Sequence, residues 1–331
     1  MNAPKCTEHD YINFLVAAQR VFSASEAARS HPAGTDKPAH DAYTRLLQRL
    51  PPDSEALWAE VQPCVDPTSG LLVIDDTTLD KPYASQMALV TRHWSGKQHE
   101  VVQGINLISL VWTDGDAAFP CDFRLYNKTE DGLSKNDHFR AMLEMAHRRG
   151  FQPALVAFDS WYSSLENLKL VRTFGWAWLT RLKGNRQVSL KAGEHQAVSD
   201  LTIPATGLQV HLRGYGMVKV FRTVDPHGNA DYWATNRLDL TESQRQVLAD
   251  RAWLVEVYHR ALKQFTGVER GQFRLERAQR NHIGLALRAY LRLEYHRSHS
   301  RLSIFNSKLD ILRTAVGLYL AHPTYGLPST A

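Results

Sequence analysis

The spacing of apolar residues changes twice along the chain, and each change predicts a different kind of structure. Over residues 1–66 the apolar positions recur every three to four residues, as in "YINFLVAAQRVF" (residues 11–22), which is typical of amphipathic helices. A loop that contains Pro and Gly, and then the pair Pro51 and Pro52, end these short helices. We therefore expect residues 1–66 to form a helical domain, either a helix-turn-helix DNA reader or a plain helical subdomain.

From residue 67 the pattern becomes that of β-strands. Apolar and β-branched runs separated by turn residues predict three consecutive strands, followed by two strands that alternate with helices. The predicted strands cover residues 71–75, 100–112, 117–126, 153–159 and 176–182, and the helices cover residues 134–150 and 164–175. This order predicts an α/β fold over residues 67–183, with a ribonuclease-H-like, mixed, five-stranded sheet flanked by helices.

A second change of pattern divides the rest of the chain. Residues 184–240 contain short alternating runs and several glycines, which predict a β-rich insertion. Residues 241–300 return to helical spacing and are expected to complete the sheet domain. The stretch from Arg251 to Arg301 carries eleven Lys and Arg against four Asp and Glu, so its surface should be basic. Residues 301–331 are expected to form an apolar helix, around "LDILRTAVGLYL", and a tail.

Composition adds a weak preference for an anionic partner. The formal net charge is +5 and the pI is about 9.0. Three widely spaced cysteines without a CxxC pair indicate neither a zinc site nor a disulfide framework. The sequence shows no signal peptide and no apolar run of the roughly 18 residues needed to cross a bilayer, so a soluble, intracellular protein is expected.

Two of the predicted strands end on carboxylates. Asp76 follows Asp75 after the run "LLVI", and Asp159 follows "ALVAF". The two strands are neighbours in a ribonuclease-H-like sheet, so Asp76 and Asp159 are expected side by side, where their charges repel unless a divalent cation lies between them. Oxygen ligands favour Mg²⁺ or Mn²⁺. A third acid would complete a two-metal site of the kind that hydrolyses phosphodiesters.

Glu256 is the candidate for the third acid. It lies in "RAWLVEVYHRALKQF", where Glu256, His259, Arg260 and Lys263 share one face of a predicted helix. Such a row would place a metal ligand beside cations that bind DNA phosphates. The alternative is an exposed helix that carries an ordinary Glu–Arg ion pair.

Three segments together resemble the DDE transposases of bacterial insertion sequences, in the group with a β-rich insertion before the last acid. "VIDDTTLDK" resembles the first-strand motif, an Asp followed by Thr, and "LVAFDSWYSS" resembles the strand of the second Asp. "WLVEVYHRALKQF" resembles the signature helix, Tyr-x2-Arg-x3-Glu-x6-Lys. The resemblance covers about residues 65–300 and implies that Asp76, Asp159 and Glu256 are the catalytic, metal-binding acids.

The match leaves two positions to be assigned. The Tyr and Arg of the signature fall on Ala249 and Ala252, and Arg251, one residue out of register, could supply the missing cation. In the first motif, the two adjacent acids face opposite sides of a strand, so only one of them can reach the metals. The family pattern places the ligand directly before Thr, which selects Asp76 and leaves Asp75 as the alternative.

Further residues are predicted to contact DNA. Arginines recur at spacings of three or four from Arg270 through Arg280, and the aromatic residues after Asp159 could stack on an unpaired base near the cut. The predicted DNA-binding residues are Arg251, His259, Arg260, Lys263, Arg270, Arg274, Trp161 and Tyr162. The alternatives are a solvated helical face for the cations and packing of the strand end for the aromatic residues. Trp233 and Tyr215 in the insertion are other stacking candidates.

The resemblance implies a DNA transposase that binds terminal inverted repeats, cuts the element ends and joins them to target DNA with two Mg²⁺ or Mn²⁺ ions. Its partners would be the double-stranded element ends and the target DNA, and it would act as a homodimer on DNA. It would lie in the bacterial cytoplasm with the nucleoid and not in a membrane. The alternatives are a ribonuclease-H-like nuclease without strand transfer and a transposase-derived DNA-binding regulator.

Overall fold

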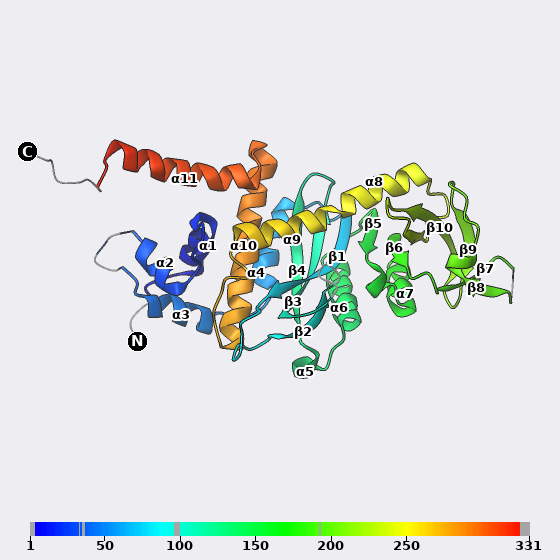
Figure 1. Cartoon of the computed structure of the whole chain (residues 1–331), viewed down its shortest axis with the longest axis horizontal. Helices are drawn as coiled ribbons and strands as arrows, with labels where there is room; N and C mark the ends of the chain where they lie inside the picture. Colours follow the sequence, from blue (N-terminus) through cyan, green and yellow to red (C-terminus); the bar gives the residue numbers. More distant parts are fainter. Residues whose placement is uncertain (1–3, 33, 35–36, 96–99, 192, 325–331) are drawn as a thin grey trace, which may run out of the picture. The chain divides into compact units, whose positions relative to one another are not determined.

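The computed structural model describes residues 4–32, 34, 37–95, 100–191 and 193–324. The chain forms two compact units: one is Ser54–His259, and the other joins Met1–Asp53 to Arg260–Ala331. Within the described ranges, every strand lies in the first unit, and the regular structure of the second unit is helical (Figure 1).

The centre of the sheet has the predicted ribonuclease-H-like order. Strand β1 lies between β3 and β5, β4 pairs with β3 on one side, and β6 pairs with β5 on the other. The pairs β1–β3 and β3–β4 are antiparallel, whereas β1–β5 and β5–β6 are parallel. The bounds are β1 (Leu71–Asp80), β3 (Glu100–Thr113), β4 (Ala118–Tyr126), β5 (Leu155–Phe158) and β6 (Trp178–Leu182). The mixed five-stranded sheet predicted from the apolar runs is therefore confirmed.

The segment after β6 extends this sheet. Strand β11 pairs with β6 in antiparallel fashion, and the chain of pairing continues through β10, β9, β7 and β8. The bounds are β7 (Gln187–Ser189), β8 (His195–Ala197), β9 (Leu208–Leu212), β10 (Gly216–Val224) and β11 (Ala230–Thr235), with a short turn η3 (Val198–Asp200). At the other edge β2 (Thr91–Ser95) pairs with β3, which the sequence pattern did not predict.

Strand β1 is longer than the sequence pattern predicted. The apolar residues Leu71 to Ile74 are buried, and their pairing with β5 ends at the partners Ile74 and Phe158. Pairing with β3 continues from Asp75 through Asp80. The sequence pattern placed Asp75 and Asp76 at the end of a strand. In the structure both lie within β1, at a point where β3 is still paired but β5 has ended. This loss of a neighbour opens space beside the two acids.

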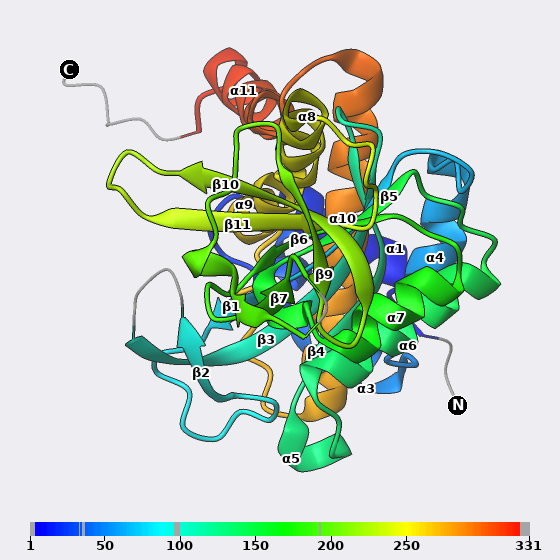
Figure 2. The same ribbon diagram turned by 90° about the vertical axis from the view of Figure 1, so that its right-hand side faces the viewer.

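Helices cover the sheet and fix the elements that carry the acids. Helix α6 (Lys135–Arg148) begins at a capping box formed by Ser134 and Asp137, and it lies beside α7 (Leu165–Thr173) (Figure 2). Phe139 of α6 packs edge-on against Phe158 of β5. Shorter elements of the same unit are α4 (Glu55–Val61), η1 (Gln62–Cys64), α5 (Lys128–Asp131) and η2 (Ser160–Tyr162).

The predicted helix that carries Glu256 is divided by a turn. Helix α8 (Glu242–Ala252) ends at Trp253, and α9 (Leu254–Phe265) begins directly after it. Tyr258 of α9 is fully buried, and its hydroxyl lies 3.1 Å from the hydroxyl of Ser109 on β3. This contact holds the first turns of α9 against the sheet.

The helical unit is built around α10 (Glu276–Ser300). The N-terminal helices α1 (Glu8–Ala17), α2 (Ala24–Ser30) and α3 (His40–Arg49) belong to this unit, and α1 and α3 pack on α10. Arg288 of α10 donates two hydrogen bonds, of 2.9 and 3.0 Å, to the carboxylate of Glu8. Helix α11 (Ile304–Ala321) is attached through Lys308. Among the described residues, no helix combines the length and the apolar character needed to span a membrane.

Candidate active site

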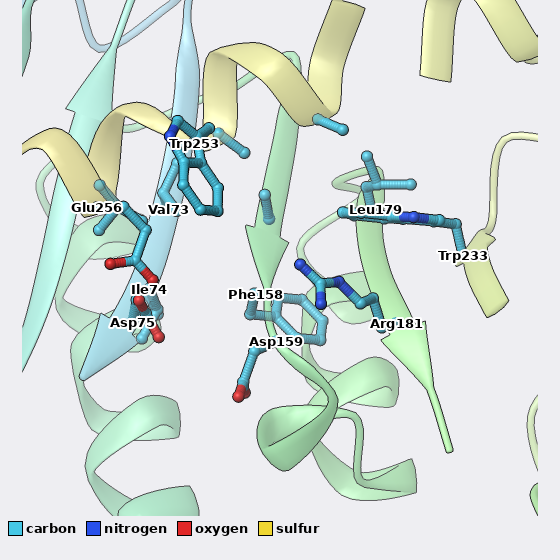
Figure 3. Close-up of a pocket in the computed structure, with 14 residues that line it drawn as sticks. Val73, Ile74, Asp75, Phe158, Asp159, Leu179, Arg181, Trp233, Trp253 and Glu256 are labelled. Atoms are coloured by element: carbon cyan, nitrogen blue, oxygen red, sulfur yellow. The ribbon is translucent and has the colours of Figure 1, made fainter. Parts of the chain in front are cut away.

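A pocket of about 250 Å³ lies beside the point where β1 loses its pairing with β5 (Figure 3). Its lining comes from β1, β5, β6, β11, α8 and α9. Three carboxylates belong to this lining, those of Asp75, Asp159 and Glu256. The acids come from three elements that are far apart in sequence, so the fold itself assembles them.

The register of the sheet explains why Asp75 and Asp159 meet. Ile74 and Phe158 are the last partners of the parallel pair β1–β5, and each acid is the next residue in its chain. Neighbouring strands are about 4.8 Å apart, so the two acids leave the sheet at adjacent points. Asp159 also begins the short turn η2, where its Oδ1 accepts a hydrogen bond of 2.9 Å from the backbone N–H of Trp161.

Helix α9 adds Glu256 and His259 to Asp75. These two residues are one turn apart on the helix, so they face the same way. The ligand atoms of Asp75, Glu256 and His259 all lie within 4.8 Å of one another, and Figure 3 shows the carboxylates of Asp75 and Glu256 pointing toward each other. The Nδ1 atom of His259 is 3.8 Å from Oδ2 of Asp75. This group could hold a metal ion.

The electrostatics of Asp75 and Asp159 favour a bound cation. Burial raises the pKa of the Asp75 carboxyl well above its ordinary value, and the neighbouring carboxylates of Asp76, Asp159 and Glu256 raise it further. The pKa of Asp159 is also raised, first because the surrounding protein removes part of its hydration and then by the charge of Asp76. Two acids that resist ionisation side by side are stabilised when a divalent ion neutralises them.

Asp76 has a different environment. Its Oδ2 accepts hydrogen bonds of 2.7 Å from both Lys135 and Asn106, and its Oδ1 accepts one of 2.8 Å from the hydroxyl of Tyr162. Burial alone would raise the pKa of Asp76, but Lys135 and the two neutral donors outweigh burial and lower it. Asp76 is therefore an ionised carboxylate whose charge is balanced by a lysine of the chain itself.

The structure thus separates the two adjacent acids of the first motif. Asp75 lines the pocket with Asp159 and Glu256, whereas Asp76 is not among the lining residues. The alternation of side chains along a strand accounts for this separation. Asp75 was the alternative in the sequence analysis, and it is the acid that the fold brings beside Glu256.

The two aromatic residues after Asp159 have opposite environments. The side chain of Trp161 is 57% exposed, and the ammonium groups of Lys135 and Lys183 lie 5.7 and 5.8 Å from the centre of its ring. Tyr162 is 0% exposed, stacked on Phe139 of α6 and bonded to Asp76. A base could reach Trp161, but the burial of Tyr162 does not allow the stacking predicted for it.

The cations predicted to bind DNA are dispersed. His259 is buried beside Asp75, which does not fit a DNA contact, and Arg251 is exposed beside Gly115 of the β3–β4 turn. In the helical unit, Arg260 is exposed, and Lys263 forms an ion pair of 3.0 Å with Glu269.

The predicted row of arginines is also divided. Arg270 and Arg274 are exposed but lie before α10, outside any helix, so the arginines from Arg270 through Arg280 do not share one helix, as their spacing had suggested. Arg277 and Arg280, within α10, bond to Leu50 and Glu276.

Two residues of the pocket, Arg181 and Trp253, were not predicted to face it, and a third, Trp233, was named only as an alternative stacking residue. Arg181 of β6 places its guanidinium 5.0 Å from the ring centre of Trp233 on β11, and Trp253 lies at the junction of α8 and α9 (Figure 3). The side chain of Arg181 is 44% exposed and lies 3.4 Å from Asp231. In the sequence, Arg181 is the single charged residue within the apolar strand "WLTRL". Its position beside Trp233 follows only from the pairing of β6 with β11.

Comparison with known proteins agrees with this geometry. A family model for the transposase DDE domain matches residues 66–292. A solved structure of piggyBac transposase, in a synaptic complex with hairpin DNA, shares the fold with a TM-score of 0.54 and 11% sequence identity, over 100% of this chain and 77% of that chain. No curated protein matches the sequence. Because the family model covers more than half of the chain and includes all three acids of the pocket, the chain belongs to the transposase DDE domain family, a family of metal-dependent DNA transposases.

Proposed function

We propose that this chain is an insertion-sequence transposase that binds the terminal inverted repeats of its element, cuts the element ends and joins them to target DNA. The observation that carries the proposal is the meeting of Asp75, Asp159 and Glu256 in one pocket of a chain that belongs to the DDE family. Transfer of a phosphoryl group between DNA strands depends on positioning and on neutralisation of charge, and a set of convergent carboxylates can provide both through bound cations.

The metal ligands in this proposal are Asp75, Asp159 and Glu256. Asp75 takes the place that the sequence pattern gave to Asp76, because Asp75 is near Glu256, and because burial and the neighbouring carboxylates raise its pKa, which a bound cation would offset. Asp76 already has Lys135 at 2.7 Å. Asn106 and Tyr162 also donate to its oxygens, so a metal at Asp76 would compete with three hydrogen-bond donors.

The donor set fits Mg²⁺ or Mn²⁺, and we propose two ions. Carboxylate oxygens are the ligands that these hard ions prefer. When bound, the ions would activate the attacking oxygen and neutralise charge on the leaving oxygen. The residues of the chain fix the positions of the ligands: the register of β1 and β5 sets Asp75 and Asp159, and buried Tyr258 anchors the helix that carries Glu256.

Cations and aromatic residues near the pocket are proposed to hold the DNA strand. Arg181 lines the pocket and can donate to a phosphate, because its guanidinium remains 44% exposed beside Trp233. Trp161 offers an exposed ring between Lys135 and Lys183, which suits an unpaired base and its phosphate. In the helical unit, the exposed Arg260, Arg270 and Arg274 are proposed to contact phosphates.

The working unit is proposed to be a homodimer on DNA. One pocket of this kind acts on one element end, and both ends must be cut and joined together, so two copies are needed. The fold is shared with a transposase solved in a synaptic complex with hairpin DNA, which supports DNA as the partner. Light scattering with and without an end duplex tests this proposal, and a cleavage-competent complex that holds one chain would contradict it.

The activity is tested with the full chain, a duplex that carries an element end, a supercoiled target plasmid and Mg²⁺ or Mn²⁺. We expect nicks at the end of the element and joined products on the plasmid. Asp75→Asn should abolish both, whereas Asp80→Asn, an exposed acid at the end of the same strand, should retain both. Nicks without joined products would indicate a nuclease without strand transfer, and specific binding without nicks would indicate a DNA-binding regulator.

A further inference from the structure

The side chain of His259 lies beside Asp75 and Glu256 and not on an exposed surface. It is only 4% exposed, which prevents direct contact with a DNA phosphate. It follows Glu256 by one turn of α9, and its ring is held next to Tyr258, whose hydroxyl is fixed at Ser109. His259 is therefore presented to Asp75 by the same rigid segment that presents Glu256.

The distance between His259 and Asp75 is that expected of two ligands to one ion. Nδ1 of His259 is 3.8 Å from Oδ2 of Asp75, which is too long for a direct hydrogen bond. Two atoms that each lie about 2.1 Å from the same ion are separated by about 3 to 4.2 Å, depending on the angle at the ion. The ligand atoms of Asp75, Glu256 and His259 all lie within 4.8 Å of one another, which is close to this range.

We propose that His259 is a nitrogen ligand, through Nδ1, of the ion held by Asp75 and Glu256. This inference rests on the proposed function, because it concerns the metal that the acids would bind. It makes the two metal positions chemically different. An ion held by Asp75, Glu256 and His259 would have mixed oxygen and nitrogen donors, whereas an ion held through Asp159 would have oxygen donors only.

The mixed donor set has a consequence for metal preference. Imidazole nitrogen suits first-row transition ions better than Mg²⁺, which prefers oxygen ligands and retains its water. The position that includes His259 should therefore bind Mn²⁺ more tightly than Mg²⁺. Removal of the imidazole should weaken Mn²⁺ binding at that position by at least about tenfold and should affect Mg²⁺ less.

The test is pulsed electron paramagnetic resonance of Mn²⁺ bound to the full chain. Unmodified protein should show coupling of Mn²⁺ to a directly bound ¹⁴N nucleus, and protein labelled with ¹⁵N-histidine should show the corresponding ¹⁵N coupling. His259→Asn should bind Mn²⁺ more weakly and lose the coupling. His138→Asn is the matched control, since His138 is also buried and lies 3.2 Å from an acid, Asp131, but is not part of the group formed by Asp75, Glu256 and His259.

The outcomes separate this inference from the proposed function. Mn²⁺ that binds in an Asp75-dependent way and supports DNA cleavage, but shows no nitrogen coupling, overturns the role of His259 and leaves the transposase proposal intact. Coupling that persists in His259→Asn also overturns it. If His259→Asn does not fold, the unmodified chain and Asp75→Asn still test the proposal: histidine nitrogen coupling that Asp75→Asn abolishes supports it, and absence of nitrogen coupling in the unmodified chain overturns it. Absence of both Asp75-dependent Mn²⁺ binding and cleavage contradicts the proposed function itself.

Discussion

Lys135 donates a hydrogen bond of 2.7 Å to Oδ2 of Asp76, so one of the two adjacent acids on β1 is already paired with a cation of the chain. Asp75, the other acid, instead lies among further acids and near His259. Consecutive residues of one strand thus have opposite electrostatic environments. This difference leads to opposite predictions for the two positions.

Asp75→Asn should stabilise the protein in the absence of metal. The raised pKa of Asp75 means that its ionised form is destabilising in the folded state, so removal of the charge should raise the free energy of unfolding at pH 7 by about 1 kcal/mol. Chemical denaturation in the presence of a chelator measures this change. A substantial loss of stability would mean that the Asp75 carboxylate is already satisfied within the protein.

Asp76→Asn should have the opposite effect. It removes the negative charge that pairs with Lys135 and replaces one of the two acceptor oxygens with an NH₂ donor, which faces Lys135 and Asn106 or the Tyr162 hydroxyl, at a site where the Lys135 and Asp76 side chains are 17% and 18% exposed. We expect the free energy of unfolding to fall by about 2–3 kcal/mol, while Mn²⁺ affinity changes by no more than a few fold. Calorimetric titration of folded Asp76→Asn protein checks the second part, and loss of Mn²⁺ binding there would identify Asp76 as a ligand.

The stabilisation of the protein by metal should increase with pH. The raised pKa values of Asp75 and Asp159 give the metal-free protein a stability contribution that is present at low pH and is lost as pH rises through these values. Metal ions compete with protons for the carboxylates of Asp75 and Asp159, so they bind best at a pH at which both carboxyls are ionised. The Mn²⁺-induced rise in melting temperature should be larger at pH 7.5 than at pH 5.5, and Asp75→Asn should reduce the difference. A rise that is independent of pH would contradict this linkage.

Lys308→Met should destabilise the helical unit. The Lys308 ammonium group donates to the backbone carbonyls of Val16, Ala18 and Phe265 at 2.7, 2.6 and 3.0 Å, and its side chain is buried. Without it, carbonyls near the ends of α1 and α9 lose their donor, which should lower the free energy of unfolding by about 2–4 kcal/mol. Arg313→Met, at an exposed position of the same helix, is the control and should change it by less than about 0.5 kcal/mol.

Trp161→Ala should weaken binding of DNA that has unpaired bases at its end. Stacking on an exposed aromatic ring contributes about 1–3 kcal/mol per base, so the affinity for such an end should fall by roughly 5- to 150-fold. Binding of a fully paired internal duplex should change much less, and Trp161→Phe should restore most of the affinity. Fluorescence anisotropy with the two DNA types measures this, and equal losses for both would show that Trp161 does not bind an unpaired base.

The sequence was sufficient to predict the central sheet and the elements that carry the acids. Apolar runs such as Leu71 to Ile74 and Leu155 to Phe158 have few alternatives to buried strands, and their order along the chain determines the mixed topology. The length of β1 was underestimated, because the polar residues Asp75 to Thr78 still pair with β3 after β5 has ended.

The choice between the two adjacent acids could not be made from the sequence. Alternation along a strand shows that only one of them can face the pocket, but not which one. The answer depends on Lys135, 59 residues further along the chain, and on the docking of α9 at Ser109. The burial of Tyr162 also depends on a residue that is distant in sequence, because the ring of Phe139 on α6 stacks on it.

The most direct test of the account is a crystal structure of the full chain soaked in Mn²⁺, with the ions located by anomalous scattering. The account predicts Mn²⁺ bound to the carboxylates of Asp75, Asp159 and Glu256, with Asp76 still bonded to Lys135. Mn²⁺ bound to Asp76, with Lys135 displaced and Asp75 outside the coordination sphere, would contradict it.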